Sequence, residues 1–246
     1  MATRWPSYTQ GWICGSTTSV ALRRILSSRW LKIPVFALCL VPTLLLAWKA
    51  LSGGLGPNPI EFVTHWTGDW TIRFLCLTLA ITPLRKLLGL PELIRFRRML
   101  GLFGFFYATQ HFLTWFVLDK FFDWNEITQD VVKRPFITAG FTAFVLLIPL
   151  AITSTAGWIR RLGGKRWQML HRLIYVSVCA GVVHYFWLVK SDIRLPLLYG
   201  AIVAVLLAYR LVASLTKGRR PVSPAAASGR VRRLSSETNE TSGSRI

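Results

Sequence analysis

The chain has 246 residues, of which 52% are hydrophobic. A soluble domain of this length closes one core and turns polar residues to water, whereas here apolar runs of near bilayer-spanning length recur along the chain. A formal net charge of +20 would suggest a nucleic-acid partner in a soluble protein, but no basic stripe with interleaved aromatic residues accompanies it. The composition therefore indicates a membrane protein and argues against nucleic-acid binding.

The two ends of the chain differ from its middle. Residues 1–31 mix Ser, Thr, Trp and Arg without the layout of a signal peptide, so we expect a poorly ordered cytoplasmic extension. Residues 215–246 are basic, rich in Ser and Thr and free of apolar periodicity, so we expect a disordered cytoplasmic tail. Both basic tails are expected to lie against the anionic cytoplasmic leaflet.

Residues 32–214 contain six apolar runs, each near the ~20 residues that a helix needs to cross a bilayer. The predicted fold is therefore all-α, a polytopic membrane bundle of six transmembrane helices. Gly and Pro residues separate the runs. The predicted spans cover approximately residues 32–51, 66–84, 99–118, 136–156, 168–188 and 195–214.

The loop charges predict the orientation of these spans. The loops after the second and fourth spans are rich in Lys and Arg, which is typical of cytoplasmic loops in an inner membrane. The loop after the third span is mixed and relatively acidic, which suits the outer face. It carries Asp119, Asp123, Glu126 and Asp130 beside Lys120, Lys133 and Arg134. With an even number of spans, both termini are expected in the cytoplasm.

Three histidines lie inside predicted spans, where an ionisable side chain is costly and indicates a functional site. His111 lies past the middle of the third span, and His184 lies at a comparable depth on the fifth, parallel span. This match predicts that the two imidazoles ligate one haem iron. The alternative is that each histidine only stabilises helix packing. His65, at the outer rim before the second span, is better explained as an interfacial residue.

His171 must contact a cofactor at a different depth in the membrane from that of His111 and His184. It precedes His184 by 13 residues on the same span, about 20 Å of helical rise, so one iron cannot reach both. Arg97 is a candidate partner for a second cofactor at this inner level, because it lies nearly four turns before His111 on the same helix face. It could pair with a haem propionate or a flavin phosphate, or less readily ligate iron.

Several motifs on successive spans carry a family resemblance. They are Ile81-Thr82-Pro83-Leu84, Arg97-Arg98-Met99-Leu100-Gly101-Leu102, Thr153-Ser154-Thr155, Gly164-Lys165-Arg166-Trp167-Gln168-Met169-Leu170-His171 and His184-Tyr185-Phe186-Trp187. Together they resemble the MsrQ (YedZ) family, the haem-binding membrane subunits of bacterial periplasmic protein-methionine-sulfoxide reductase systems, within the ferric-reductase-like transmembrane group. The resemblance covers roughly residues 30–215.

The resemblance implies a b-type cytochrome that takes electrons from the quinone pool, with one or two haems and flavin mononucleotide as a family cofactor. It implies a periplasmic molybdopterin-containing partner that repairs oxidised methionines. His111, His171 and His184 match the family's haem-associated positions, while Arg97 stands where related oxidases carry an inner histidine. The basic loop Arg160–Arg166 is a plausible contact for a flavin phosphate. Arg73 and Lys49 are candidate propionate partners, although Lys49 is more readily explained by snorkelling.

The chain offers no catalytic triad, paired carboxylates or phosphate loop, so we expect an electron-transfer subunit rather than a catalytic one. Two other functions stay open. A proton or metal transporter subunit would need acidic residues inside the spans, and Asp69 is the nearest candidate. A stand-alone ferric or cupric reductase domain would need its own electron entry, and no nicotinamide or flavin domain is expected after the sixth span.

Overall fold

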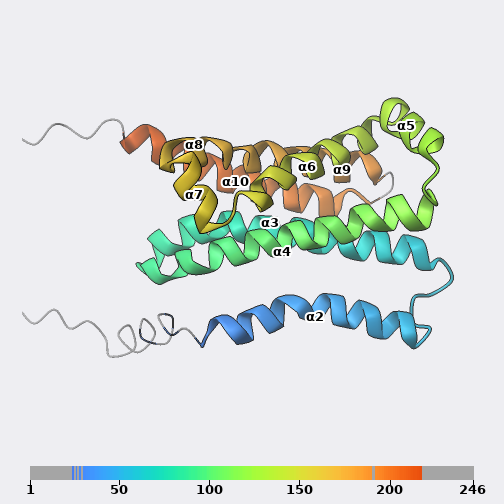
Figure 1. Cartoon of the computed structure of the whole chain (residues 1–246), viewed down its shortest axis with the longest axis horizontal. Coiled ribbons are helices and arrows are strands. Elements are labelled where there is room, and N and C mark those ends of the chain that lie inside the picture. The colour runs from blue at the N-terminus through green and yellow to red at the C-terminus, as the bar shows by residue number, and fades with distance from the viewer. Residues whose placement is uncertain (1–23, 25, 27, 29, 190–191, 218–246) are drawn as a thin grey trace, which may run out of the picture. The chain divides into compact units, whose positions relative to one another are not determined.

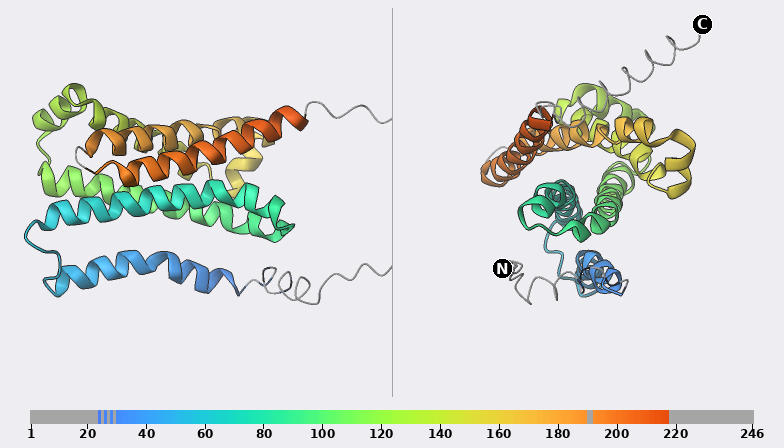
Figure 2. Two further views of the ribbon diagram at one scale, coloured as in Figure 1. Left: turned by 180° about the vertical axis from the view of Figure 1, so that it is seen from behind. Right: turned by 90° about the vertical axis from the view of Figure 1, so that its left-hand side faces the viewer.

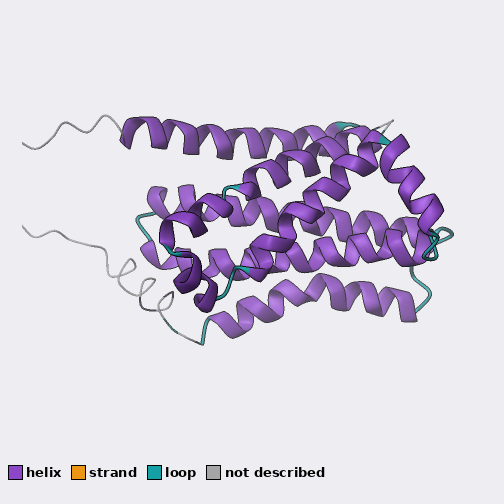
Figure 3. Ribbon diagram, turned by 45° about the horizontal axis from the view of Figure 1, so that its top comes forward, coloured by secondary structure: helices purple, strands orange, loops and turns teal. Residues whose placement is uncertain are grey.

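The computed structural model describes residues 24, 26, 28, 30–189 and 192–217. Within these ranges the chain forms helices and loops and no strand (Figure 3), which confirms the predicted all-α class. The predicted tails, 1–31 and 215–246, lie almost entirely outside the described residues. The chain divides into two compact units, residues 1–206 and 207–246. Of the second unit, the structure describes the final turns of helix α10, which ends at Lys217.

Each predicted span overlaps one long helix, although the span at 168–188 is interrupted at residues 171–172 and the span at 136–156 runs past the end of its helix at Ile152. The long helices are α2 (Lys32–Leu51), α3 (Pro59–Leu87), α4 (Ile94–Leu113), α6 (Pro135–Ile152), α9 (Leu173–Leu188) and α10 (Arg194–Lys217). The shorter elements are the 3₁₀ turn η1 (Pro91–Leu93), the π-helical turn η2 (Thr114–Asp119), and helices α5 (Trp124–Lys133), α7 (Ala156–Leu162) and α8 (Gly164–Leu170). The π-turn η2 directly continues α4, so the helical run through His111 extends to Asp119.

Four segments are long and apolar enough to cross a membrane: Lys32–Leu51, Pro135–Ile152, Gly164–Leu188 and Arg194–Thr216. Helices α3 and α4 coincide with the second and third predicted spans but are more polar. Helix α3 carries Asp69 and Arg73, and α4 begins with several arginines. The count of six transmembrane helices therefore stays a prediction.

The helix ends follow from local chemistry. Asn58 caps α3 by accepting from the backbone N–H of Glu61, and Pro59 occupies the first helical position, where its missing N–H costs nothing. Asp123 caps α5 by accepting from the N–H groups of Asn125 and Glu126. Gly163, with φ of +73°, separates α7 from α8 in a backbone conformation that other residues rarely adopt. These signals set where the chain turns between helices.

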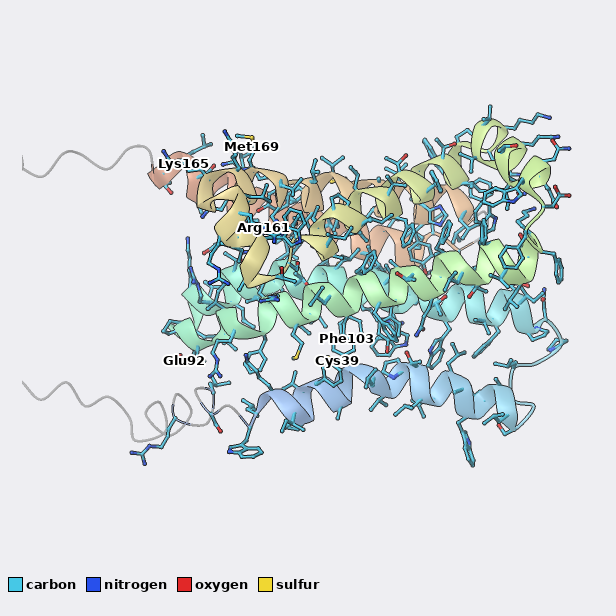
Figure 4. The ribbon with its side chains drawn as sticks, viewed as in Figure 1. Cys39, Glu92, Phe103, Arg161, Lys165 and Met169 are labelled. Carbon is cyan, nitrogen blue, oxygen red and sulfur yellow. The ribbon has the colours of Figure 1, made fainter. Side chains whose placement is uncertain are left out.

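Helices α3 and α4 pack along each other, as do α6 and α9. Viewed along the helices, the α3–α4 pair lies between α2 and the α6–α9 pair (Figure 2). An aromatic core fills the space between α2, α3 and α4, where Cys39 and Phe103 approach from facing helices (Figure 4) and Phe74 and Tyr107 complete the cluster. The Tyr107 hydroxyl donates to the Cys39 carbonyl over 2.8 Å, so this buried polar group is satisfied.

The connections gather at two opposite ends of the helices (Figure 1). The α2–α3 loop and α5 lie at one end, called here the α5 end. The α3–α4 connection, α7 and α8 lie at the other, where Arg161 and Lys165 are found (Figure 4). The loops that the sequence identifies as strongly basic therefore share one end, as the predicted orientation requires.

A buried lysine organises the α5 end. Lys120, at 6% exposure, ion-pairs with Glu126 at 2.6 Å, with Asp130 at 2.8 Å and with Asp119 at 3.6 Å. Asp130 is also buried and pairs through its other oxygen with Arg134 at 3.2 Å. Burial lowers the pKa of Lys120, but the bonds to Asp130 and Glu126 and the charge of Asp119 outweigh it, so the pKa is raised overall. The charged form therefore ties the loop after η2 to α5.

Replacing Lys120 with methionine should destabilise this end of the protein. The substitution leaves Asp130 buried with one cationic partner fewer, and we expect a loss of about 3 kcal/mol, near the low end for breaking a buried pair. Thermal unfolding in detergent measures it. Lys133→Met is the matched control, because Lys133 is exposed and bonds Gln129 on its own helix.

The pH dependence of wild-type stability offers a second measurement. Because the folded-state pKa of Lys120 is raised, its contribution is complete below the unfolded pKa of about 10.4 and is lost as the pH rises through the folded value. A Lys120→Met variant should lack this alkaline loss. Equal alkaline profiles for both proteins would contradict the assigned role.

Candidate cofactor-binding cavity

A cavity of about 520 Å³ opens among α3, α4, α6 and α9. Its volume falls within the ~300–1,000 Å³ typical of small-molecule and cofactor sites. Its walls are mostly apolar and include Ile72, Leu75, Phe112, Phe144 and Leu147. Among these walls lie the side chains of His111 from α4 and His184 from α9. The structure thus brings together two of the three histidines that the sequence places inside spans.

Backbone carbonyls hold both imidazole rings. His111 Nδ1 lies 3.0 Å from the carbonyl oxygen of Thr64 on α3, and His184 Nδ1 lies 2.6 Å from that of Phe136 on α6. A carbonyl can only accept, so Nδ1 carries the proton in each ring, and Nε2 keeps its lone pair. Neither Nε2 atom makes a hydrogen bond to a described residue. This is the tautomer that a metal ligand needs, with its second nitrogen fixed by a backbone group.

The two rings face each other at short range. Their centroids lie 6.0 Å apart, and the ring planes are inclined by 73°. A metal–imidazole nitrogen bond is about 2 Å long, so two such bonds in line, together with the ring radii, give a centroid spacing of roughly 6 Å. The pair therefore has the separation that one metal centre between two imidazoles requires.

Two glycines make room for these rings. A Cβ atom on Gly140 would lie 2.7 Å from His184 Nδ1, closer than real Cβ contacts come. A Cβ atom on Gly68 would lie 3.1 Å from His111 Cε1. Gly140 lies one turn after Phe136 on α6, and Gly68 lies one turn after Thr64 on α3. Each ring thus packs on a glycine beside the carbonyl that orients it.

His171 lies elsewhere, at the junction of α8 and α9, and does not line this cavity. Its ring stacks on Trp167 with centroids 3.9 Å apart, and its Nδ1 lies 3.2 Å from the Trp167 carbonyl oxygen. No hydrogen bond of normal geometry reaches its buried Nε2 among the described residues. Arg97 lies within electrostatic range of this imidazole. His171 therefore lies at a place separate from the cavity, where the charge of Arg97 acts on its imidazole.

The remaining polar candidates divide between the cavity and the helix flanks. His65 lines the cavity near its opening and faces Glu61 at 3.8 Å. Arg73 donates through Nε to the Tyr199 hydroxyl at 3.0 Å and pairs with Asp69 at 3.5 Å. Lys49 lies over the Phe62 and Trp66 rings. Neither Arg73 nor Lys49 lines the cavity.

Sequence reasoning missed the groups that orient the histidines. The carbonyls of Thr64 and Phe136 carry no side-chain signal, because any residue supplies a carbonyl. Gly68 and Gly140 did leave one, since an isolated glycine inside a helical pattern usually has a packing or functional reason. Arg134, at the cavity opening, was read from the sequence as an ordinary loop charge.

Comparison with known proteins identifies the family of the chain. The family described as ferric reductase like transmembrane component matches residues 33–182, and this range contains most of the cavity walls. A protein-methionine-sulfoxide reductase heme-binding subunit MsrQ from Herminiimonas arsenicoxydans is 60% identical over 74% of this chain and 84% of its own length. Subunits of the same name from Ralstonia nicotianae and Caulobacter vibrioides are 52% and 47% identical over 75% and 77% of this chain, and 86% and 88% of their own lengths.

The chain therefore belongs to the MsrQ family of heme-binding subunits, as the sequence motifs predicted. The cavity residues fit such a cofactor on structural grounds. Two Nε2 lone pairs are available, the walls are apolar and aromatic, and the glycines leave space where a side chain would displace a ring.

Gly140→Ala should disturb the site through His184. The added methyl group must displace the imidazole or α6, at a cost of about 1–3 kcal/mol for overpacking, so haem content per purified protein should fall at least about fivefold. Gly101→Ala is the control, because a Cβ there meets Thr78 Cγ2 at an ordinary 3.5 Å. Equal haem content in the two variants, measured by pyridine haemochrome, would show that close packing does not hold His184.

Proposed function

We propose that this chain is a b-type cytochrome that passes electrons from membrane quinol to a periplasmic, molybdopterin-containing methionine sulfoxide reductase, which repairs oxidised proteins. One observation carries the proposal: two imidazoles with fixed Nδ1–H groups and free Nε2 atoms face each other across one cavity. The names of the relatives support both the haem and the reductase partner.

His111 and His184 are the proposed axial ligands of one haem b. Bound there, haem supplies one-electron redox chemistry. The chain's own residues orient the ligands through Thr64 and Phe136, exclude water with apolar walls, and keep both imidazoles neutral by leaving them no acidic partner in the described structure. No general base or nucleophile is needed for electron transfer, which agrees with a subunit that is not the catalytic one.

A second cofactor level is proposed around His171 and Arg97. The Nε2 lone pair of His171 is the group that would ligate a second haem iron, and the Arg97 guanidinium would hold an anionic group of a haem or a flavin. Flavin mononucleotide is the family's implied second cofactor, and the basic residues Arg160–Arg166, which span the end of α7 and the start of α8, would face its phosphate from the same end of the helices.

The proposed setting is the bacterial inner membrane, with both termini in the cytoplasm and residues 32–214 as a domain of six spans. Helices α3 and α4 would cross as an inner pair, because they pack along each other between α2 and the α6–α9 pair, where polar residues can find partners on neighbouring helices. Asp69 illustrates this, since it accepts from the Tyr185 hydroxyl at 3.1 Å and pairs with Arg73. The cavity, near the α5 end, would then lie toward the periplasm.

The reduced-minus-oxidised spectrum of the purified protein tests the proposal. Wild-type protein from haem-replete cells should show a b-type band, and His111→Ala and His184→Ala should each abolish the haem held between them, because one imidazole alone cannot complete the axial pair. His171→Ala is the informative comparison and should leave that haem in place. A wild-type protein without the band would overturn the function, and full haem in both alanine variants would overturn the ligand pair.

Donor and partner need a separate assay on the same protein. A quinol analogue should reduce the haem anaerobically, and the periplasmic reductase should reoxidise it only when methionine sulfoxide is added. If quinol reduces the haem but the reductase does not reoxidise it, the proposed partner is ruled out. If quinol does not reduce the haem, the proposed donor is ruled out.

A further inference from the structure

The lining of the cavity changes along the helices. At the α5 end, residues near helix termini contribute charged and polar groups to it, namely Asn58, Glu61, His65, Asp119 and Arg134. Residues from the middle of the helices, such as Leu75, Ala143 and Leu147, line its depth. A haem has a matching asymmetry, with two carboxylate-bearing propionates on one edge and apolar substituents on the other. Burying propionates among the apolar residues would leave charges unpaired, at a high cost.

Arg134 is the only lysine or arginine among the described residues that line the cavity. Its Nε pairs with Asp130 at 3.2 Å, while no hydrogen bond joins its terminal nitrogens to a described residue. A guanidinium presents its donors as a planar fork that matches a carboxylate. Arg134 is thus oriented by one contact and still has the nitrogens that would hold an anion.

The local backbone favours an anion at the same place. Arg134 is the N-cap residue of α6, an 18-residue helix that begins with Pro135, and Phe136 and Ile137 in its first turn line the cavity. The positive end of the α6 dipole therefore points to the opening. Asp130 also pairs with buried Lys120. The negative charge of Asp130 therefore does not need the terminal nitrogens of Arg134 for its neutralisation.

We infer that Arg134 binds the propionate edge of the haem held by His111 and His184, so that this edge faces the α5 end of the protein. The inference rests on the proposed function and adds to it a positioning residue and the direction in which the cofactor is inserted. It also replaces the two propionate partners suggested by the sequence. Arg73 is bound to Tyr199 and Asp69, Lys49 lies over aromatic rings, and neither lines the cavity.

The test compares two forms of the cofactor in the full-length protein in nanodiscs. Haem and its dimethyl ester, whose propionates carry no charge, are titrated into apo protein as wild type, Arg134→Gln, Arg134→Lys and Lys133→Gln. We expect Arg134→Gln to weaken binding of haem about tenfold and to leave binding of the ester unchanged. Arg134→Lys should lie between, because it keeps the charge and loses the fork. Lys133→Gln, one residue away and outside the cavity lining, should match wild type.

A redox titration gives an independent readout. Removing a cation beside the propionates should lower the haem midpoint potential in Arg134→Gln and not in Lys133→Gln. Equal losses for haem and ester in Arg134→Gln would mean a structural role and would overturn the inference, as would wild-type affinity and potential in that variant. Failure of the wild-type protein to bind either cofactor would instead overturn the proposed function.

Discussion

The site depends on two hydrogen bonds between imidazole N–H groups and backbone carbonyls. Thr64 and Phe136 belong to α3 and α6, whereas the histidines they orient belong to α4 and α9. Each bond therefore links two helices and sets a tautomer at the same time. An unpaired N–H would be costly inside a membrane, so helix packing and ligand orientation stabilise each other, and the arrangement of the four helices determines where the two Nε2 atoms lie.

Close helix packing makes those bonds possible. Gly68 and Gly140 lie one turn beyond the accepting carbonyls, and each presents bare backbone to an imidazole. A larger side chain would push the ring away from its acceptor and change the spacing of the pair. A similar hydrogen bond links helices in the α2–α3–α4 core. There Tyr107 is fully buried against stacked aromatic rings, and its hydroxyl donates to the Cys39 carbonyl. In both places a buried polar group is satisfied by a backbone oxygen of a neighbouring helix.

The charged residues at the α5 end form one connected group around the cavity opening. Lys120 is buried among three carboxylates. One of them, Asp130, also forms an ion pair with Arg134, which lines the cavity. A loop that the sequence marks only as mixed and relatively acidic is thus an ordered ion-pair network beside the site. Under the proposed function, this network lies on the side from which electrons leave toward the partner, and it orients Arg134, which lines the cavity.

The sequence by itself determined the helical class, the place of all six helical runs and the family, because apolar periodicity, Gly and Pro breaks and ordered motifs are local properties. It also singled out His111 and His184, since a matched depth on parallel spans follows from counting residues, and the structure brings these two rings to 6.0 Å. Only the tertiary structure decided the tautomers, the need for Gly68 and Gly140, and the position of Arg134. These features depend on which face each helix turns to its neighbours, and a backbone carbonyl or a free guanidinium nitrogen leaves no mark in the order of residues.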